Sequence, residues 1–105
     1  MKTQARVVVI GGGEPLLRHD LWEIIAAIRR HGMGVSLTTN GTIVRPRDLQ
    51  EFVRHRVRVN VSIDGAEANH DRIRGAAGSF RKTVKGIQRM LDAGIKPTVR
   101  FTLLN

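Results

Sequence analysis

The sequence predicts an α/β fold in which short parallel strands alternate with helices in the order βαβαβαβ. Three observations lead to this prediction. Residues 57–63 alternate between apolar and polar side chains, residues 7–10 form a β-branched apolar run that stops at three glycines, and residues 80–91 repeat apolar side chains at helical spacing. Strands that alternate with helices are joined by right-handed crossovers, which place the strands parallel in one sheet.

Turn and cap residues divide the chain into its elements. The predicted strands are residues 7–10, 35–39, 57–63 and 98–104, and the predicted helices are residues 21–31, 46–53, 66–73 and 80–93. Asp20 and Ser79 are the expected N-caps of the first and last of these helices, because short polar side chains can accept a hydrogen bond from the first helical turn. We expect Phe80, Val84, Ile87 and Leu91 to form the buried stripe of the last helix.

The faces of the predicted sheet differ in polarity. One set of alternate residues in the later strands is apolar, and the opposite set includes Ser36, Thr38, Asn40, Arg58, Asn60, Ser62, Arg100 and Thr102. A sheet covered by helices on both sides needs apolar residues on both faces. We therefore expect helices on one face, toward which Val59, Val61, Ile63, Val99 and Phe101 point, and an open polar face carrying Asn60, Ser62 and Thr102. This arrangement is a partial (βα) barrel, with residues 1–105 as a single domain.

Composition places the chain among ordinary globular proteins. Apolar residues make up 41% and charged residues 26% of the 105 residues, so a hydrophobic core can form. There is no apolar run long enough to cross a membrane and no leader pattern at the start, so we expect a cytoplasmic protein with no membrane partner. The absence of cysteine excludes disulfides, thiolate metal ligands and protein-held iron–sulfur clusters within these residues.

The net charge of +9 raises the question of nucleic-acid binding. Its basic residues are spread along the chain, with only a local cluster at Arg54, Arg56 and Arg58, and four aromatic residues offer little for base stacking. We interpret the charge as solvated helix surface. A basic nucleic-acid-binding α/β module is kept as an alternative.

The loop after the first strand, Gly11-Gly12-Gly13-Glu14-Pro15, is the strongest candidate site. Glycines between a strand and a helix let backbone N–H groups approach a polar ligand. The loop is not a dinucleotide fingerprint, because Leu16 stands where the third glycine would be. A carboxylate such as that of Glu14, held at the end of a strand, is suited to accept hydrogen bonds from a cationic amine.

The other predicted strand ends carry polar residues of the same kind. Asn40-Gly41 and Asp64-Gly65 follow two strands, and turn chemistry alone could explain each pair. In a barrel, however, the loops after the strands share one rim, where sites are built. Beyond the third strand, Arg72 or Arg74 could bind a ligand carboxylate or simply be solvated. The four histidines lack metal-ligand spacing, and we expect no metal site: His19, His31, His55 and His70.

These motifs resemble those of the radical S-adenosylmethionine enzymes. The resemblance rests on Val7 to Leu17, Leu37 to Gly41, Val59 to Gly65 and His70 to Gly75, in this order and spacing. It is closest to the branch with peptide-modifying, sulfatase-maturing and haem- or quinone-cofactor-biosynthesis members. The resemblance implies a partial (βα)6 barrel, of which this chain is the second to fifth strands, and a 5′-deoxyadenosyl radical that abstracts a substrate hydrogen.

The family holds its [4Fe–4S] cluster with a C-x3-C-x2-C loop after its first strand, and this sequence has neither that strand nor any cysteine. The resemblance therefore implies an internal fragment that is inactive alone and binds S-adenosylmethionine weakly or not at all. A peptide or tetrapyrrole would be the substrate of the complete enzyme. A cluster-free scaffold or peptide-binding relative stays open as an alternative, and bare sheet edges predict self-association.

Individual roles also follow from the resemblance. Gly12, Gly13 and Glu14 would hold the methionine amino group, and Ser62 would approach the ribose or the methionine carboxylate. Arg74, or Arg72 in its place, would pair with that carboxylate. The weaker candidates at the rim are Asn40 and Asn105. No residue of this chain is expected to be catalytic.

Overall fold

The computed structural model describes residues 6–64 and 78–101. Its strands are β1 (Val7–Ile10), β2 (Gly34–Thr39), β3 (Arg58–Ile63) and β4 (Thr98–Phe101), and its helices are the 3₁₀ helix η1 (Pro15–Leu17), α1 (Leu21–Arg30), α2 (Pro46–Arg54) and α4 (Ser79–Asp92). The element order confirms the predicted alternation of strands and helices. The helix expected at residues 66–73 lies outside the described residues.

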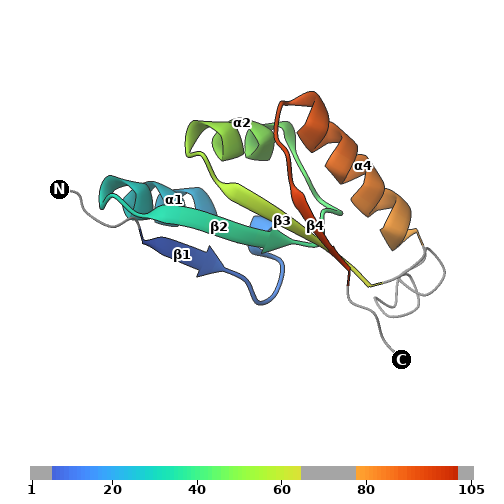
Figure 1. Cartoon of the computed structure of the whole chain (residues 1–105), viewed down its shortest axis with the longest axis horizontal. Helices are drawn as coiled ribbons and strands as arrows, with labels where there is room; N and C mark the ends of the chain where they lie inside the picture. Colours follow the sequence, from blue (N-terminus) through green and yellow to red (C-terminus); the bar gives the residue numbers. More distant parts are fainter. Residues whose placement is uncertain (1–5, 65–77, 102–105) are drawn as a thin grey trace.

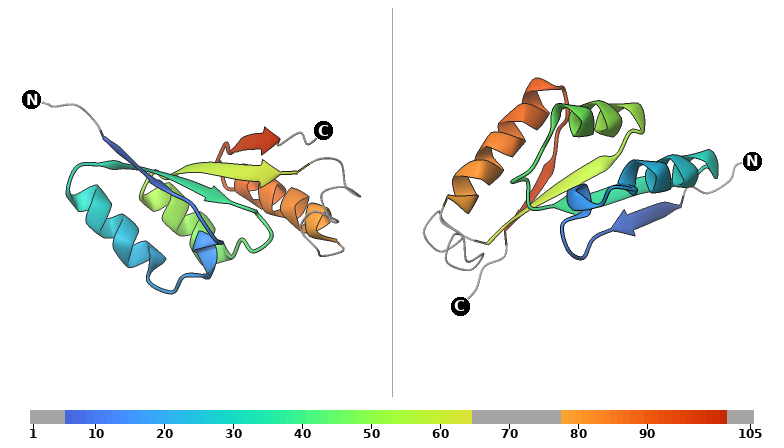
Figure 2. Two further views of the ribbon diagram at one scale, coloured as in Figure 1. Left: turned by 90° about the horizontal axis from the view of Figure 1, so that it is seen from below. Right: turned by 180° about the vertical axis from the view of Figure 1, so that it is seen from behind.

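The described strands form one parallel sheet in the order β1-β2-β3-β4. Each strand therefore pairs with its neighbour in the sequence (Figure 1). Figure 2 shows α1, α2 and α4 on the same side of this sheet, which leaves the opposite side open. Strands in sequential order with helices on one face are the arrangement of a partial (βα) barrel and confirm the predicted fold class.

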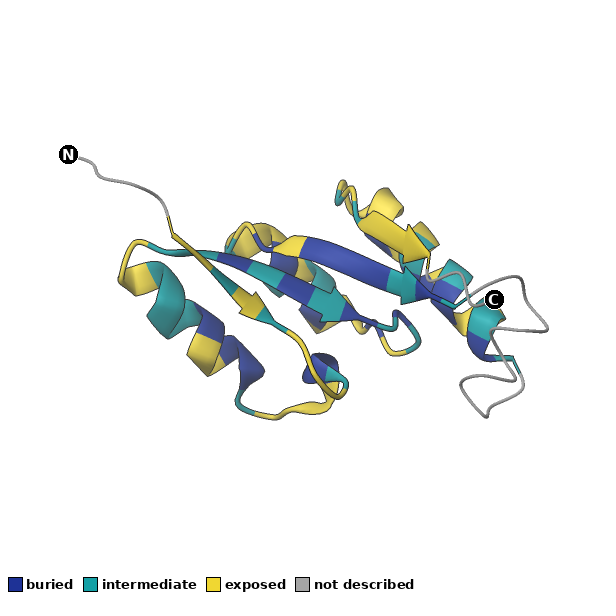
Figure 3. Ribbon diagram, turned by 60° about the horizontal axis from the view of Figure 1, so that its bottom comes forward, coloured by how far each residue is buried: buried dark blue, intermediate teal, exposed yellow. Residues whose placement is uncertain are grey.

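The core lies between the two central strands and the helices. It is built around buried Val35 and Leu37 of β2, Val59 and Val61 of β3, and Phe52 of α2. Figure 3 shows this buried centre flanked by the more exposed strands β1 and β4. The period-two pattern of residues 57–63 therefore predicted both the strand and its buried face.

The outer strands bury less than expected. Register places Val99 and Phe101 beside Val61 and Ile63, on the helix side of the sheet, but these two residues are 38% and 59% exposed. They lie on β4, which has no further strand beside it among the described residues. Asn60 lies on the polar face, as expected, but it is buried there: its amide donates to Ser36 Oγ at 2.9 Å. Thr102 lies outside the described residues.

The helix caps and the buried face of α4 differ from expectation. The N-cap of α4 is Gly78, with φ 81°, and Ser79 is the first helical residue. Asp20 is an N-cap position whose side chain makes no capping hydrogen bond, because it is paired with Arg18. The buried residues of α4 are Ser79, Thr83, Gly86 and Met90, whereas Leu91 of the expected stripe is 54% exposed.

Small side chains explain the change of face in α4. A Cβ atom added to Gly86 would lie 2.1 Å from the carbonyl oxygen of Gly41. The helix therefore approaches the turn after β2 more closely than a stripe of large apolar residues would permit. Among the described residues, no helix has the length and apolar character needed to cross a membrane.

Candidate functional site

Glu14 directs its carboxylate from the loop after β1 to the end of β2. Its Oε1 accepts hydrogen bonds from the Asn40 N–H at 2.8 Å and the Thr39 hydroxyl at 2.8 Å. Its Oε2 accepts from the Leu16 N–H at 2.9 Å and lies 2.9 Å from the same hydroxyl. Glu14 therefore caps η1 and connects the loop after β1 to Thr39 at the end of β2, 25 residues further along the chain.

The Glu14 carboxylate retains capacity for another donor. An ionised carboxylate offers about four lone-pair sites, whereas two backbone N–H groups and one hydroxyl supply three protons. Among the described residues, no lysine, arginine or histidine forms an ion pair with it. A half-buried carboxylate of this kind is suited to a cationic donor from outside the protein.

A hollow of about 280 Å³ lies beside this carboxylate at the carboxyl ends of the strands. It is lined by Gly12, Gly13, Glu14, Thr38, Thr39, Asn40 and Ser62. Five residues proposed from the sequence thus lie together. Arg72, Arg74 and Asn105 lie outside the described residues. Small-molecule pockets usually enclose roughly 300–1,000 Å³, so this hollow suits the end of a ligand better than a whole one.

A larger hollow of about 450 Å³ borders the same loop and is also lined by Gly13 and Glu14. Its walls include Ile10, Leu17, Leu21 and Ile24, so it is mainly apolar. Neither Thr39 nor Asn40, which donate to Glu14 at the end of β2, lines this larger hollow. The smaller hollow is therefore the one in which an amine can meet the carboxylate together with the polar ends of β2 and β3.

The backbone of the loop depends on Gly12. Its φ of 89° lies in the left-handed region that side chains rarely adopt, while a Cβ there would meet nothing within 4 Å. Glycine is therefore required at position 12 because of its backbone conformation, and not because a side chain would clash there. Gly13 is not in that region and also has open space at its Cβ position.

The turn after β2 is held by its own side chains and by α4. Asn40 Oδ1 accepts a hydrogen bond from the Thr42 N–H at 2.9 Å. The Asn40 side chain therefore stabilises the turn, while its backbone N–H donates to Glu14. Thr83 of α4 donates its hydroxyl to the Asn40 carbonyl at 2.8 Å. Thr39 and Thr83 were not singled out as site residues from the sequence. For Thr39, the available signal was a hydroxyl on the buried face where a strand ends.

The helix η1, which follows the loop, is anchored through Arg45 by a buried carboxylate on α2. Asp48 is fully buried, accepts from Trp22 Nε1 of α1 at 3.2 Å and forms an ion pair with Arg45 at 2.8 Å. Arg45 also donates to the Leu16 carbonyl of η1. The hydrogen bonds and charge of Asp48 raise the pKa of the Arg45 guanidinium above its ordinary value. The network joins α1, α2 and η1, the short helix that Glu14 caps.

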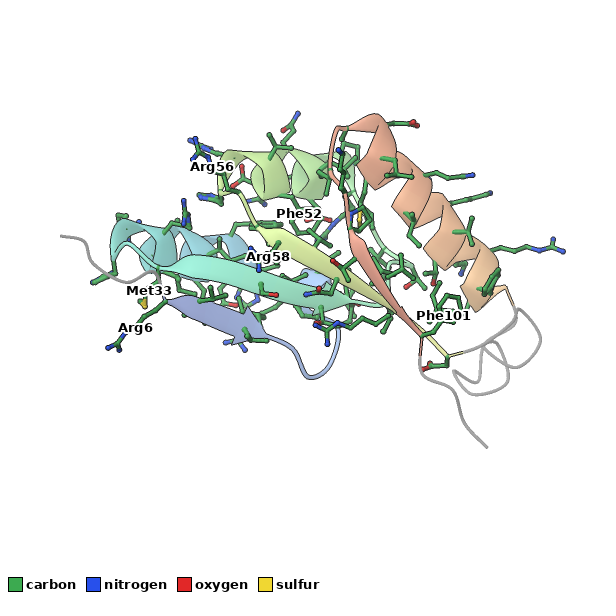
Figure 4. All side chains as sticks on the ribbon, in the orientation of Figure 1. Arg6, Met33, Phe52, Arg56, Arg58 and Phe101 are labelled. Carbon is green, nitrogen blue, oxygen red and sulfur yellow. The ribbon has the colours of Figure 1, made fainter. Side chains whose placement is uncertain are left out.

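The basic cluster considered from the sequence lies away from this hollow. Arg56 and Arg58 stand where β3 begins, whereas Glu14 follows the end of the parallel strand β1 (Figure 4). Arg54 is paired with Glu51 at 3.5 Å. In the described part of the chain, no group of three or more histidine, aspartate or glutamate side chains is placed to hold a metal ion.

Compared with known protein families, the chain matches the Radical SAM superfamily over residues 1–105. The chain belongs to the Radical SAM superfamily.

Curated relatives include enzymes of haem and peptide-derived cofactor synthesis. The chain is 42% identical over 99 residues to the AdoMet-dependent heme synthase of Methanosarcina barkeri, covering 92% of this chain and 28% of the relative. It is 39% identical over 109 residues to the mycofactocin maturase MftC of Mycobacterium tuberculosis strain H37Rv, covering 99% and 28%. The chain thus spans about a quarter of the length of these relatives.

Solved structures share the fold. A structure described as native anSMEcpe with bound AdoMet superposes with a TM-score of 0.72 at 19% identity, covering 97% of this chain and 30% of that chain. Streptococcus suis SuiB bound to precursor peptide SuiA superposes with a TM-score of 0.73 at 18% identity, covering 90% and 21%.

The residues of this chain fit one of the two cofactors of the family and not the other. The superfamily uses S-adenosylmethionine and a [4Fe–4S] cluster. Iron–sulfur clusters are held by cysteine thiolates, and this sequence contains no cysteine. The residues present therefore do not fit the cluster. The Glu14 carboxylate and its hollow do fit the amine of an amino acid, which is one end of S-adenosylmethionine.

Proposed function

We propose that this chain carries part of the S-adenosylmethionine-binding rim of a radical S-adenosylmethionine enzyme. The observation that carries the proposal is the Glu14 carboxylate, which borders a polar hollow, has room for one more donor and has no cationic partner in the described part of the chain. Its role is to accept hydrogen bonds from the methionine ammonium, with Gly12 and Gly13 beside it.

The opposite end of the amino acid needs a cation. Arg74 is proposed to pair with the methionine carboxylate, with Arg72 as its substitute, while Ser62 approaches the ribose or that carboxylate and Asn40 and Asn105 lie at the rim. Arg100 is a further candidate, because it is the register partner of Ser62 on β4 and its side chain forms no ion pair within the described residues. The ligand supplies the radical chemistry, and this chain binds and orients it.

For the whole protein we propose a peptide or tetrapyrrole substrate. Curated relatives carry the names heme synthase, Fe-coproporphyrin III synthase and mycofactocin maturase. Arg58 and Arg100 share the open face of the sheet with Ser62 and suit a substrate that carries carboxylates. The chain alone is proposed to lack radical activity. Its single-domain organisation and its cytoplasmic location remain predictions.

Calorimetry tests the proposal. Titration of S-adenosylmethionine into the chain should show weak binding that Glu14→Ala and Arg74→Ala each abolish. Glu23→Ala, which removes an exposed carboxylate on α1, is the matched control and should bind as the wild type does. Binding that survives Glu14→Ala would contradict the proposal.

A nucleic-acid-binding module would behave differently. Its affinity for an oligonucleotide would fall steeply with salt and would depend on Arg54, Arg56 and Arg58 instead of Glu14. The superfamily match gives no support to this reading. We therefore expect no salt-sensitive oligonucleotide binding that these three arginines control.

A further inference from the structure

Helix α4 contacts the turn that orients Glu14, although α4 lies far along the chain from both. Thr83 Oγ1 donates to the Asn40 carbonyl oxygen at 2.8 Å, a contact between residues 43 positions apart. The same hydroxyl lies 3.0 Å from the Ser79 carbonyl one helical turn earlier. Thr83 is fully buried, so water does not replace this hydrogen bond when it is lost.

Asn40 is thus held through both of its backbone groups. Its N–H donates to Glu14 Oε1 at 2.8 Å, and its C=O accepts from Thr83. These two groups belong to the successive peptide planes on either side of the Asn40 Cα. Fixing both planes fixes the direction in which the N–H points, and with it one of the donors that place the Glu14 carboxylate.

Close packing keeps α4 against this turn. Gly41 has φ 74°, and a Cβ there would lie 3.2 Å from Val61 Cγ1 and 3.3 Å from Thr83 Cγ2. A Cβ on Gly86 would lie 2.1 Å from the Gly41 carbonyl oxygen. The turn is therefore enclosed between β3 and α4, and Gly86 is what lets Thr83 reach the Asn40 carbonyl.

We propose that Thr83, with the close approach that Gly86 permits, is a positioning residue for Glu14. It acts through the Asn40–Gly41 turn and does not touch the ligand. Its effect on ligand binding rests on the proposed function of Glu14, whereas its effect on the turn does not. The consequence is that α4 sets how well the hollow discriminates ligands with an amine from ligands without one.

Two substitutions separate the hydroxyl of Thr83 from its methyl group. Thr83→Val keeps the shape of the side chain and removes the donor, while Thr83→Ser keeps the donor and removes the methyl group. Thr98→Val makes the same chemical change at an exposed position of β4 and serves as the matched control. Gly86→Ala is not needed for this comparison, so a failure of that variant to fold does not affect the test.

Amide hydrogen exchange measures how firmly the Asn40–Gly41 turn is held in the absence of ligand. In Thr83→Val the Asn40 N–H should exchange about fivefold faster, the loss expected for one neutral hydrogen bond, while the N–H of Val61 in β3 is unchanged. Thr83→Ser should stay within about twofold of the wild type. Unchanged exchange at Asn40 in Thr83→Val, or equal acceleration at Asn40 and Val61, would overturn the inference.

Two soluble compounds test whether loss of the Thr83 hydroxyl weakens ligand binding. S-adenosylhomocysteine carries the amino-acid end, and 5′-methylthioadenosine lacks it. Thr83→Val should weaken only the first, by about fivefold, and Thr83→Ser should restore it. Equal weakening of both probes would overturn the positioning role. If wild type and Glu14→Gln show the same preference between the probes, the proposed function fails instead, and exchange at Asn40 still decides the role of Thr83.

Discussion

The contact between Gly86 and Gly41 makes a sharp prediction for the substitution Gly86→Ala. The added methyl group would lie 2.1 Å from the Gly41 carbonyl oxygen, whereas real Cβ atoms essentially never approach below 3.0 Å, so α4 and the turn must separate by roughly 1 Å. The two atoms nearest to the new methyl group belong to the backbone of Gly41, which cannot rotate away as a flexible side chain can.

The expected loss of stability in Gly86→Ala is the difference between two opposing effects on the free energy of unfolding. Overpacking of this kind costs about 1–3 kcal/mol, and a backbone contact places it near the upper end. Alanine is better than glycine inside a helix by about 1 kcal/mol, which offsets part of this cost. We therefore expect Gly86→Ala to lower the free energy of unfolding by about 2 kcal/mol, a large fraction of the stability of a small domain.

Urea denaturation measures the effect. With a slope of about 1–2 kcal/mol per M, the midpoint should fall by roughly 1–2 M while the slope itself is unchanged. Gly11→Ala is the matched control, because its Cβ would meet nothing within 4 Å and its φ is not in the left-handed region. A Gly86→Ala variant as stable as Gly11→Ala would refute the close approach of α4 to the turn.

Three further predictions follow from the described contacts. Asp48→Ala leaves the buried Trp22 N–H without its acceptor and should cost about 2–4 kcal/mol in urea denaturation; a cost below about 0.5 kcal/mol would contradict the network. The Arg18 guanidinium hydrogen-bonds Asp20 and lowers the pKa of that carboxyl, so the pair stabilises the fold at neutral pH and loses this effect as the pH falls through the lowered pKa. Arg18→Ala should raise that pKa in an NMR titration, and an unchanged midpoint would refute the pairing. Sedimentation velocity should show association that grows with concentration through the exposed edge strands, and Val9→Lys on β1 should weaken it; a stable monomer at all concentrations would count against bare edges.

Local pattern was sufficient to predict the strands and the side of the sheet that the helices cover. Val59, Val61 and Ile63 alternate with polar residues, and this alternation reports burial directly because side chains on a strand point to opposite faces. The carboxylate of Glu14 could also be proposed from its place between a strand and a helix.

The sequence indicated only part of how α4 packs. Hydrophobic periodicity selected Phe80, Val84, Ile87 and Leu91, of which Ile87 packs against the core. The close approach to the turn after β2 uses Thr83 and Gly86 instead. Periodicity weighs apolar size, and a helix that approaches a backbone turn needs small residues at the contact. The hydrogen bond from Trp22 to Asp48 was missed for a related reason, since Trp22 lies 26 residues from Asp48 and no local pattern marks the contact.

The central claim is that Glu14 receives the amine of S-adenosylmethionine, and amide chemical shifts test it most directly. The N–H groups of Leu16 and Asn40 donate to the Glu14 carboxylate, so they report any change in its hydrogen bonding. Addition of S-adenosylmethionine should shift both resonances in the wild type, 5′-methylthioadenosine should leave them unchanged, and Glu14→Gln should remove the response to S-adenosylmethionine. Equal shifts with both compounds, or shifts confined to residues 54–58, would contradict the account.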